Sequence, residues 1–315
     1  MPTAELRAFL FAHPAAHSLS PALHQAALAA VGWAGSYRAE DVPPEQLAGR
    51  IQALRDAAAQ AGPGGPVTGA NLSLPHKVSV MALLDDLTPA ARAIGAVNTL
   101  FWQGGQLCGD NTDAPGLRAA LEDAGYRPGS AGTETQAVVL GAGGAARAAL
   151  WVLREWGVPT LILNRTPERA QALADEWRQP GWTPQAVAAG AVNWSRTGLI
   201  LNASSAGLSR PDETPLELSP EQWQQLPAGA LVYDMVYRPE FTRLRRDAGA
   251  QGVRSEGGLG MLAHQAALAF ERWTGERPAA GLLLAAARRE LAQSAEGAEV
   301  RGTEVKGAAA GGAEA

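Results

Sequence analysis

Hydrophobic and polar residues in the middle of the chain alternate in the order strand, helix, strand, helix. A short apolar run, Ala137–Leu140, precedes a helical segment of small and apolar residues, Ala145–Trp156. A second apolar run begins at Pro159 and is followed by another helical pattern over Pro167–Arg178. Short apolar runs that alternate with helices are typical of a parallel sheet joined by crossover helices. We therefore predict an α/β fold for this segment.

The same alternation continues on both sides of this segment. Further strands are predicted at Arg7–Ala12, Ser36–Val42, Val67–Leu74, Gly198–Leu201 and Ala230–Asp234. Further helices are predicted at Ala22–Val31, Pro44–Gln60, Ala114–Ala124, Met261–Thr274 and Ala279–Ala292. Two apolar runs flank Gly104 and Gly105, which predicts a hairpin. The pattern therefore predicts an α/β protein over most of the chain.

The turn after the run Ala137–Leu140 carries the pattern Gly141-x-Gly143-x-x-Ala146. The first glycine permits a sharp turn, the second lets the backbone approach a pyrophosphate, and a small third residue lets the helix pack on the strand. The positive end of the helix would face that pyrophosphate. The motif and its strand-turn-helix context predict a dinucleotide site. A glycine turn in another type of βαβ unit is the alternative.

The residues after the second strand indicate which dinucleotide binds. NAD-binding proteins usually have an acidic residue there for the ribose hydroxyls, whereas arginine suits the 2′-phosphate of NADP. This chain has Asn164-Arg165-Thr166, followed by Pro167 and Arg169, and Thr166-Pro167 is typical of a helix N-terminus. Two guanidinium groups beside a helix N-terminus form a phosphate site. We therefore predict NADP, with a solvated helix start as the alternative for the arginines.

Polar residues also follow the strands of the N-terminal part. Ser18 and Ser20 come after the first strand, and Lys77 lies at the junction after the third. Asn98 and Asp113 flank the predicted hairpin, which would bring them close together. Ligand sites of α/β sheets form at such carboxyl ends. We predict a converging polar site here, with helix capping as the alternative role for Ser20 and Asp113.

Composition narrows the classes of partner. The 315 residues suffice for two domains, and the net charge of −5 disfavours nucleic acid and favours small molecules. Cys108 is the single cysteine, so an intramolecular disulfide is excluded. The sequence contains no recognisable signal peptide or membrane span, so we expect a cytoplasmic protein. The five histidines lack metal-binding spacing, and no metal is predicted.

Eight segments, taken in their order along the chain, resemble shikimate dehydrogenases. They are Ser18–Pro21, Asn71–Lys77, Gly95–Thr99, Gly109–Asp113, Gly141–Ala145, Asn164–Thr166, Tyr233–Tyr237 and Gly258–Gln265. The resemblance extends from about residue 8 to residue 290. It implies an NADP-dependent oxidoreductase of the shikimate pathway, and so of aromatic amino acid biosynthesis, that interconverts 3-dehydroshikimate and shikimate.

The resemblance also implies a role for individual residues. It places the substrate at Ser18, Ser20, Ser73, Lys77, Asn98, Asp113, Tyr237 and Gln265. It places the cofactor at Gly141, Ala142, Gly143, Gly144, Ala145, Asn164, Arg165, Thr166, Arg169, Met235 and Gly258. Lys77 is the implied catalytic lysine, and a Lys77–Asp113 pair can stabilise charge and supply a proton route when a ring ketone is reduced. Whether Lys77 donates the proton or acts by its charge stays open. Ser73 and Ala146 depart from the family, which more often has threonine and serine there.

The expected architecture is a two-domain α/β fold. Residues 1–112 would form the substrate-binding catalytic domain, completed by C-terminal helices within residues 258–293. Residues 113–257 would form a Rossmann-like, doubly wound parallel-sheet domain that binds NADP. Residues 294–315 contain mainly Ala, Gly and Glu without aromatic residues, and we predict a disordered tail.

Three other functions agree with part of the pattern. A quinate/shikimate dehydrogenase that uses NAD, or a paralogue acting on another cyclic hydroxy acid, commonly has an acidic residue where this chain has Arg165. A methyltransferase that uses S-adenosylmethionine would leave Lys77 unexplained, and a non-catalytic nucleotide sensor would need neither Lys77 nor Asp113. A homodimer is compatible with the sequence, which does not determine the oligomeric state.

Overall fold

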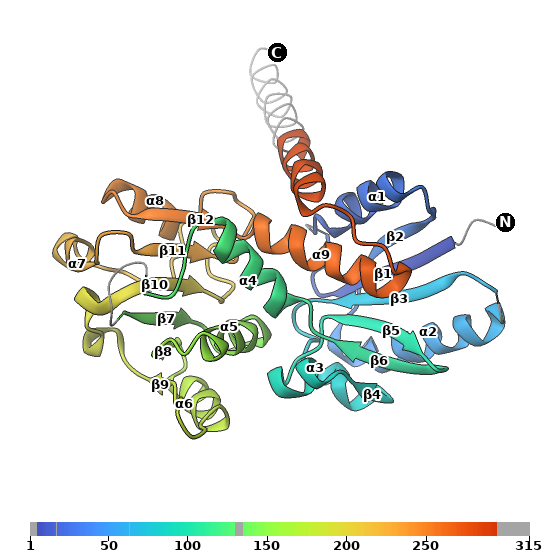
Figure 1. Ribbon diagram of the computed structural model, residues 1–315, viewed down its shortest axis with the longest axis horizontal. Coiled ribbons are helices and arrows are strands. Elements are labelled where there is room, and N and C mark those ends of the chain that lie inside the picture. Colours follow the sequence, from blue (N-terminus) through green and yellow to red (C-terminus); the bar gives the residue numbers. More distant parts are fainter. Residues whose placement is uncertain (1–4, 17, 63, 130–134, 295–315) are drawn as a thin grey trace, which may run out of the picture.

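The computed structural model describes residues 5–16, 18–62, 64–129 and 135–294. In this part of the chain two six-stranded sheets lie side by side, and helices α4 (Asp113–Asp123) and α9 (Leu259–Thr274) run between them (Figure 1). The predicted fold class, an α/β protein with a Rossmann-like parallel sheet beside an N-terminal α/β unit, is confirmed.

The first sheet is mixed and has the strand order β2-β1-β3-β5-β6-β4. β1 is parallel to β2 and β3, whereas β5 is antiparallel to both β3 and β6. The turn between β5 and β6 contains Gly104 and Gly105, both with positive φ, as the predicted hairpin requires. The strands are β1 (Glu5–Ala12), β2 (Ala34–Asp41), β3 (Val67–Leu72), β4 (Asp86–Leu87), β5 (Thr99–Gln103) and β6 (Gln106–Asp110). The helices of this part are α1 (Ser20–Val31), α2 (Leu47–Ala61) and α3 (Pro89–Ile94).

The second sheet is parallel and has the strand order β12-β11-β10-β7-β8-β9. The chain starts in the centre, moves outward on one side and then returns to the other side, so β7 and β10 flank a topological switch point. Ligands of open α/β sheets bind at such a point. The strands are β7 (Gln136–Leu140), β8 (Thr160–Leu163), β9 (Gln185–Ala186), β10 (Thr197–Asn202), β11 (Leu231–Asp234) and β12 (Arg254–Gly257). The helices are α5 (Gly144–Glu155), α6 (Pro167–Glu176), α7 (Pro220–Gln225) and α8 (Arg243–Ala250).

The C-terminal part of the described chain is helical. After α9, residues 280–294 form a further helix close to the predicted segment Ala279–Ala292. The rest of the tail, predicted to be disordered, lies outside the described residues. Over the described ranges we find no helix with the length and apolar character that crossing a membrane requires.

Neither Ser20 nor Asp113 is the N-cap of the helix that it begins. α1 begins at Ser20 with Leu19 at the N-cap, and the backbone N–H of Ser20 donates to Ser18 Oγ at 3.2 Å. α4 begins at Asp113, and Asn111 Oδ1 accepts a hydrogen bond from the N–H of Ala114 at 3.2 Å. The capping role is therefore wrong for both residues, because each lies inside its helix. The Asp113 carboxylate is available for other partners.

Helix α9 joins the cores of the two sheets. Its buried residue Met261 belongs to the core around β7, whereas Ala263 and Phe270 belong to the core that includes β1 and α1. α9 crosses α4 where Gly116 faces Gln265, so the two backbones approach closely. The absence of a side chain at position 116 therefore sets the distance between the two helices.

We expect Gly116→Ala to destabilise the protein. A Cβ at this position would lie 2.9 Å from both the Cβ and the backbone nitrogen of Gln265, and overpacking of this kind costs about 1–3 kcal/mol. The matched control is Gly49→Ala in α2, where a Cβ meets nothing within 4 Å and alanine favours the helix by about 0.5–1 kcal/mol. Urea denaturation measures both changes. Equal midpoints for the two variants would show that the crossing accepts a Cβ.

Candidate active site

A cavity of about 1440 Å³ opens between the two sheets. Its walls come from the carboxyl ends of strands in both sheets and from α9. All the side chains that the sequence assigns to the substrate line this cavity, and so do all the predicted cofactor residues except Thr166. Thr166 is exposed and does not line the cavity, although it occupies the N-cap position of α6. The fold thus brings together residues from eight separate segments.

Lys77 and Asp113 form a hydrogen-bonded ion pair in this cavity. Lys77 Nζ donates to Asp113 Oδ2 at 2.6 Å, and the two side chains are 18% and 6% exposed. The aliphatic part of Lys77 lies against the glycine turn of the other sheet, because a Cβ at Gly144 would be 3.2 Å from Lys77 Cβ. A charged hydrogen bond of this length is strong. The stem of Lys77 therefore lies beside the start of α5, while its ammonium group is held by Asp113.

Asn98 orients the second oxygen of Asp113. Its Nδ2 donates to Asp113 Oδ1 at 3.0 Å and to Thr112 Oγ1 at 2.9 Å, while its Oδ1 accepts from the Thr112 N–H at 2.7 Å. Gln265 Oε1 lies 3.4 Å from the same Nδ2. The acceptor and donor ends of the amide are thereby fixed. Asp113 consequently uses one oxygen for Asn98 and the other for Lys77.

A second buried layer supports Asn98. Asn71 on β3 donates from Nδ2 to the Asn98 carbonyl and to Thr99 Oγ1, each at 3.0 Å. Asn71 Oδ1 accepts from the Tyr37 hydroxyl at 2.9 Å. The functional roles predicted from the sequence did not include Asn71 or Tyr37. The available signal was a polar residue inside an apolar strand, which must find partners when it is buried.

His24 packs against this layer from the core side. Its side chain is fully buried, and its ring stacks on Tyr37 with centroids 4.1 Å apart and lies 5.3 Å from the ring of Trp273. Among the residues that the structure describes, neither ring nitrogen has a hydrogen-bond partner. Burial lowers the pKa of His24 to about 3, and the neighbouring Asn71 has a smaller opposite effect. His24 is therefore neutral in the folded protein at neutral pH.

The N-terminal and C-terminal halves of the chain also meet at Tyr237. Burial raises the pKa of the Tyr237 hydroxyl, and its hydrogen bond with Ser18 lowers that pKa by less. Ser18 follows β1, whereas Tyr237 follows β11, so this contact joins the two sheets at the cavity wall. Both residues line the same cavity as Lys77 and Asp113.

The two glycines of the turn have different surroundings. Gly141 has a φ of +115°, and a Cβ there would lie 3.0 Å from the Ala203 carbonyl oxygen. Gly143 is the N-cap of α5, with no side-chain cap, and a Cβ on it would meet no atom within 4 Å. Position 143 therefore leaves open space at the start of α5, as an anion site there requires.

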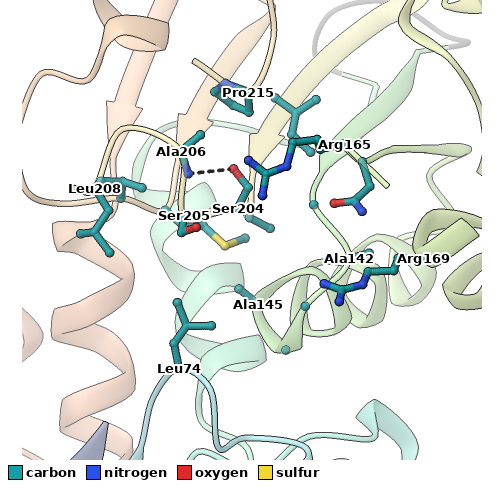
Figure 2. A pocket seen from close by; sticks show the side chains of 18 of the residues that line it. Leu74, Ala142, Ala145, Arg165, Arg169, Ser204, Ser205, Ala206, Leu208 and Pro215 are labelled. Atoms are coloured by element: carbon teal, nitrogen blue, oxygen red, sulfur yellow. Dashed lines mark hydrogen bonds between the residues drawn. The ribbon is translucent and has the colours of Figure 1, made fainter. Parts of the chain in front are cut away.

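Two arginines lie at the cavity, Arg165 after β8 and Arg169 in the first turn of α6. Arg165 and Arg169 are exposed, and Figure 2 shows both among the side chains that line the pocket, with Ala142 and Ala145 of the glycine turn. Helix α6 begins beside them at Pro167, and the Thr166 side chain makes no capping hydrogen bond. Two cationic groups and an uncapped helix N-terminus thus converge, which suits a phosphate.

The segment after β10 forms a further wall that sequence analysis did not assign to the site. Ser204, Ser205 and Ala206 line the pocket (Figure 2). Asn202 Oδ1 accepts from the N–H and the hydroxyl of Ser204 at 3.0 and 2.7 Å, and Asn202 Nδ2 donates to buried Asp234 at 2.8 Å. The small and polar residues after the strand were the available signal. The Asn202–Asp234 contact ties the ends of β10 and β11 together.

We expect the stability of the protein to fall in mild acid because of His24. Its folded pKa lies below the unfolded value of about 6.5, so its contribution is fully present above that pH and is lost as the pH falls towards 3. Between pH 7.5 and pH 5.0 the loss should reach about 2 kcal/mol. His24→Phe keeps an aromatic ring at this position and cannot titrate.

Urea denaturation of the wild type and of His24→Phe at several pH values tests this expectation. A packing penalty in the variant shifts its free energy of unfolding equally at every pH, so the comparison uses the slope. We expect the wild type to lose more stability than the variant below pH 6.5. Parallel curves would contradict the proposed titration of His24.

Two family profiles match the chain. The profile of the shikimate dehydrogenase substrate binding domain matches residues 10–100, and that of the shikimate 5′-dehydrogenase C-terminal domain matches residues 258–288. Among curated relatives, a shikimate dehydrogenase (NADP(+)) of Thermus thermophilus is 44% identical over 288 residues, covering 91% of this chain and 99% of that protein. The corresponding enzyme of Symbiobacterium thermophilum is 42% identical and covers 90% and 93%.

Solved structures show the same similarity. The shikimate 5-dehydrogenase of Thermus thermophilus in complex with NADP(H) and shikimate superimposes with a TM-score of 0.77 at 43% identity, covering 90% of this chain and 99% of that one. The ligand-free 5-ketofructose reductase of a Gluconobacter strain has a TM-score of 0.76 at 30% identity, with coverages of 92% and 99%. Proteins with different named substrates therefore share this fold.

Proposed function

The chain belongs to the shikimate dehydrogenase family, and from this premise we propose that it catalyses the reversible, NADP-dependent reduction of 3-dehydroshikimate to shikimate. The observation that carries the proposal is one cavity with the Lys77–Asp113 pair on one wall and the glycine turn on the other. The contact between Gly144 and the Lys77 stem places these two features side by side. The names of the relatives and their coverage of the chain agree with this reaction.

The residues of the second sheet fit NADP. Gly143 leaves space at the uncapped start of α5 for a pyrophosphate. Arg165 and Arg169 supply the positive charge that a 2′-phosphate needs. When bound as NADPH, the cofactor would supply a hydride to the substrate. Gly258 lies so close to Met235 that a Cβ would be 2.1 Å from the Met235 carbonyl oxygen, which keeps this wall of the cavity thin.

Lys77 is the group that would act on the substrate oxygen. Its ammonium group can donate a hydrogen bond or a proton where negative charge develops during ketone reduction. Asp113 holds Lys77 in place through the hydrogen bond of 2.6 Å between Lys77 Nζ and Asp113 Oδ2. Asn98 keeps the carboxylate from rotating, because it binds the other oxygen. The role of the pair is therefore charge stabilisation with a defined proton route.

The remaining polar residues suit a ring with several hydroxyl groups. The cavity is lined by five further residues with a hydroxyl or an amide, which are Ser18, Ser20, Ser73, Tyr237 and Gln265. A buried polar partner that is left unsatisfied costs free energy, so such a site discriminates strongly against substrates that lack one hydroxyl. We assign these residues, with Lys77, Asn98 and Asp113, to substrate recognition.

Three further parts of the proposal concern organisation. Residues 1–112 with 258–293 would bind the substrate, and residues 113–257 would bind NADP, which corresponds to the two sheets. We also propose a cytoplasmic location. A chain with a single cysteine needs no intramolecular disulfide, which agrees with the reducing conditions of the cytoplasm. A homodimer stays a prediction that sedimentation of the purified protein would test.

An assay of NADP reduction at about 340 nm, where the reduced nicotinamide absorbs, tests the reaction. We expect strong activity with shikimate and NADP, and much weaker activity with NAD or with quinate. Comparable activity with NAD would contradict the role of Arg165 and Arg169. A preference for quinate would contradict the proposed substrate while leaving the family assignment intact.

We expect Lys77→Met to lower kcat by about 10²–10⁴-fold, the range typical of a lost general acid or base. Methionine keeps an unbranched chain against Gly144, so binding of NADP should change little. Asp113→Asn should also lower kcat, because Lys77 then faces a neutral amide. Steady-state kinetics and calorimetric binding of NADP and shikimate separate chemistry from binding. Unchanged turnover in Lys77→Met would exclude the catalytic role.

A further inference from the structure

Glu213 lies beside Arg165 at the cofactor end of the cavity. It belongs to the loop of residues 203–219 between β10 and α7, lines the cavity, and has a side chain that is 33% exposed. Its Oε1 is 3.9 Å from Arg165 Nη1, whereas the Arg165 side chain is 89% exposed. Arg165 thus has a carboxylate as its counterion at a place where the proposed function requires a phosphate.

Glu213 has a second cationic partner. Its Oε2 lies 3.3 Å from Nε of Arg210, which precedes it by three residues in the same loop. The Glu213 N–H donates to the Arg210 carbonyl at 2.9 Å, so the turn holds the two side chains together. Glu213 can therefore release Arg165 without losing every counterion. This arrangement permits an exchange of partners when an anion arrives.

We propose that Glu213 is a specificity-determining positioning residue that competes with the 2′-phosphate of NADP for Arg165. The inference rests on the proposed function, because it concerns the NADP phosphate site. A ligand with a 2′-phosphate must displace the Glu213 carboxylate from Arg165 and lie near its negative charge. A ligand without this phosphate leaves the Arg165–Glu213 pair intact. Glu213 therefore weakens the binding of NADP while leaving that of NAD unchanged.

The size of the effect follows from the exposure of the pair. Ion pairs between exposed side chains contribute little and are screened by salt. We expect removal of the Glu213 charge to tighten binding of a 2′-phosphorylated ligand by about threefold at low ionic strength. The gain should decrease as salt is added, since it is electrostatic. A structural effect of the substitution would lack this dependence on salt.

Calorimetric titration with two adenosine ligands tests the proposal in the full chain. Adenosine 2′,5′-bisphosphate and adenosine 5′-monophosphate differ by the 2′-phosphate alone. The variants are Glu213→Gln, which keeps the shape of the side chain, and Glu217→Gln as a matched control. Glu217 lies on the same loop and also lines the cavity, but its carboxylate pairs with Arg243 at 3.1 Å, whereas that of Glu213 pairs with Arg165. Both variants are also prepared with Arg165→Gln.

We expect Glu213→Gln to bind the bisphosphate about threefold more tightly than the wild type at low salt, with monophosphate affinity unchanged. Glu217→Gln should bind both ligands as the wild type does. The gain should vanish in the Arg165→Gln background, because the competition needs Arg165.

Weaker or unchanged bisphosphate binding in Glu213→Gln would overturn the proposal. So would a gain that persists without Arg165, since Glu213 would then act on the phosphate directly. Equal wild-type affinities for the two adenosine ligands would instead remove the proposed NADP preference and this inference with it. These outcomes separate a failure of the further inference from a failure of the proposed function.

Discussion

The ion pair between Lys77 and Asp113 is the interaction on which the site depends. A carboxylate that is 6% exposed is costly to bury unless it is paired and hydrogen-bonded. Here one oxygen faces Lys77 and the other faces Asn98, so both are satisfied. Lys77 follows β3 and Asp113 follows β6, so the first sheet brings the two charges together. The contact between the Lys77 stem and Gly144 then places the pair against the glycine turn of the second sheet.

The polar layer behind the pair fixes the position of the Asp113 carboxylate. Tyr37, Asn71 and Asn98 are linked through hydrogen bonds that run from the core to Asp113. Buried polar networks of this kind favour a single arrangement, because any alternative leaves a donor or acceptor unsatisfied. His24 closes the layer from the core side as a neutral ring. The catalytic wall thus rests on groups that cannot shift independently.

The cofactor wall follows a different design. Its recognition groups are backbone N–H groups at helix starts and exposed arginines. Glycines let neighbouring loops approach each other closely, as Gly141 approaches Ala203 and Gly258 approaches Met235. The charges there are exposed and are partnered weakly, as Arg165 and Glu213 show. Such groups can exchange partners at little cost. One wall of the cavity is therefore preorganised by burial, whereas the other is adjustable.

The sequence alone determined the fold class, the glycine turn and the basic strand end, and nearly all the site residues that it predicted do line the cavity. These features depend on local spacing or on motifs, so they can be recognised without coordinates. The structure decided that Asp113 and Ser20 are not helix caps, and that Thr166 lies outside the cavity. It also paired Glu213 with Arg165 and buried His24 against Tyr37. Those contacts join residues that are distant in sequence, and tertiary packing alone selects which buried groups meet.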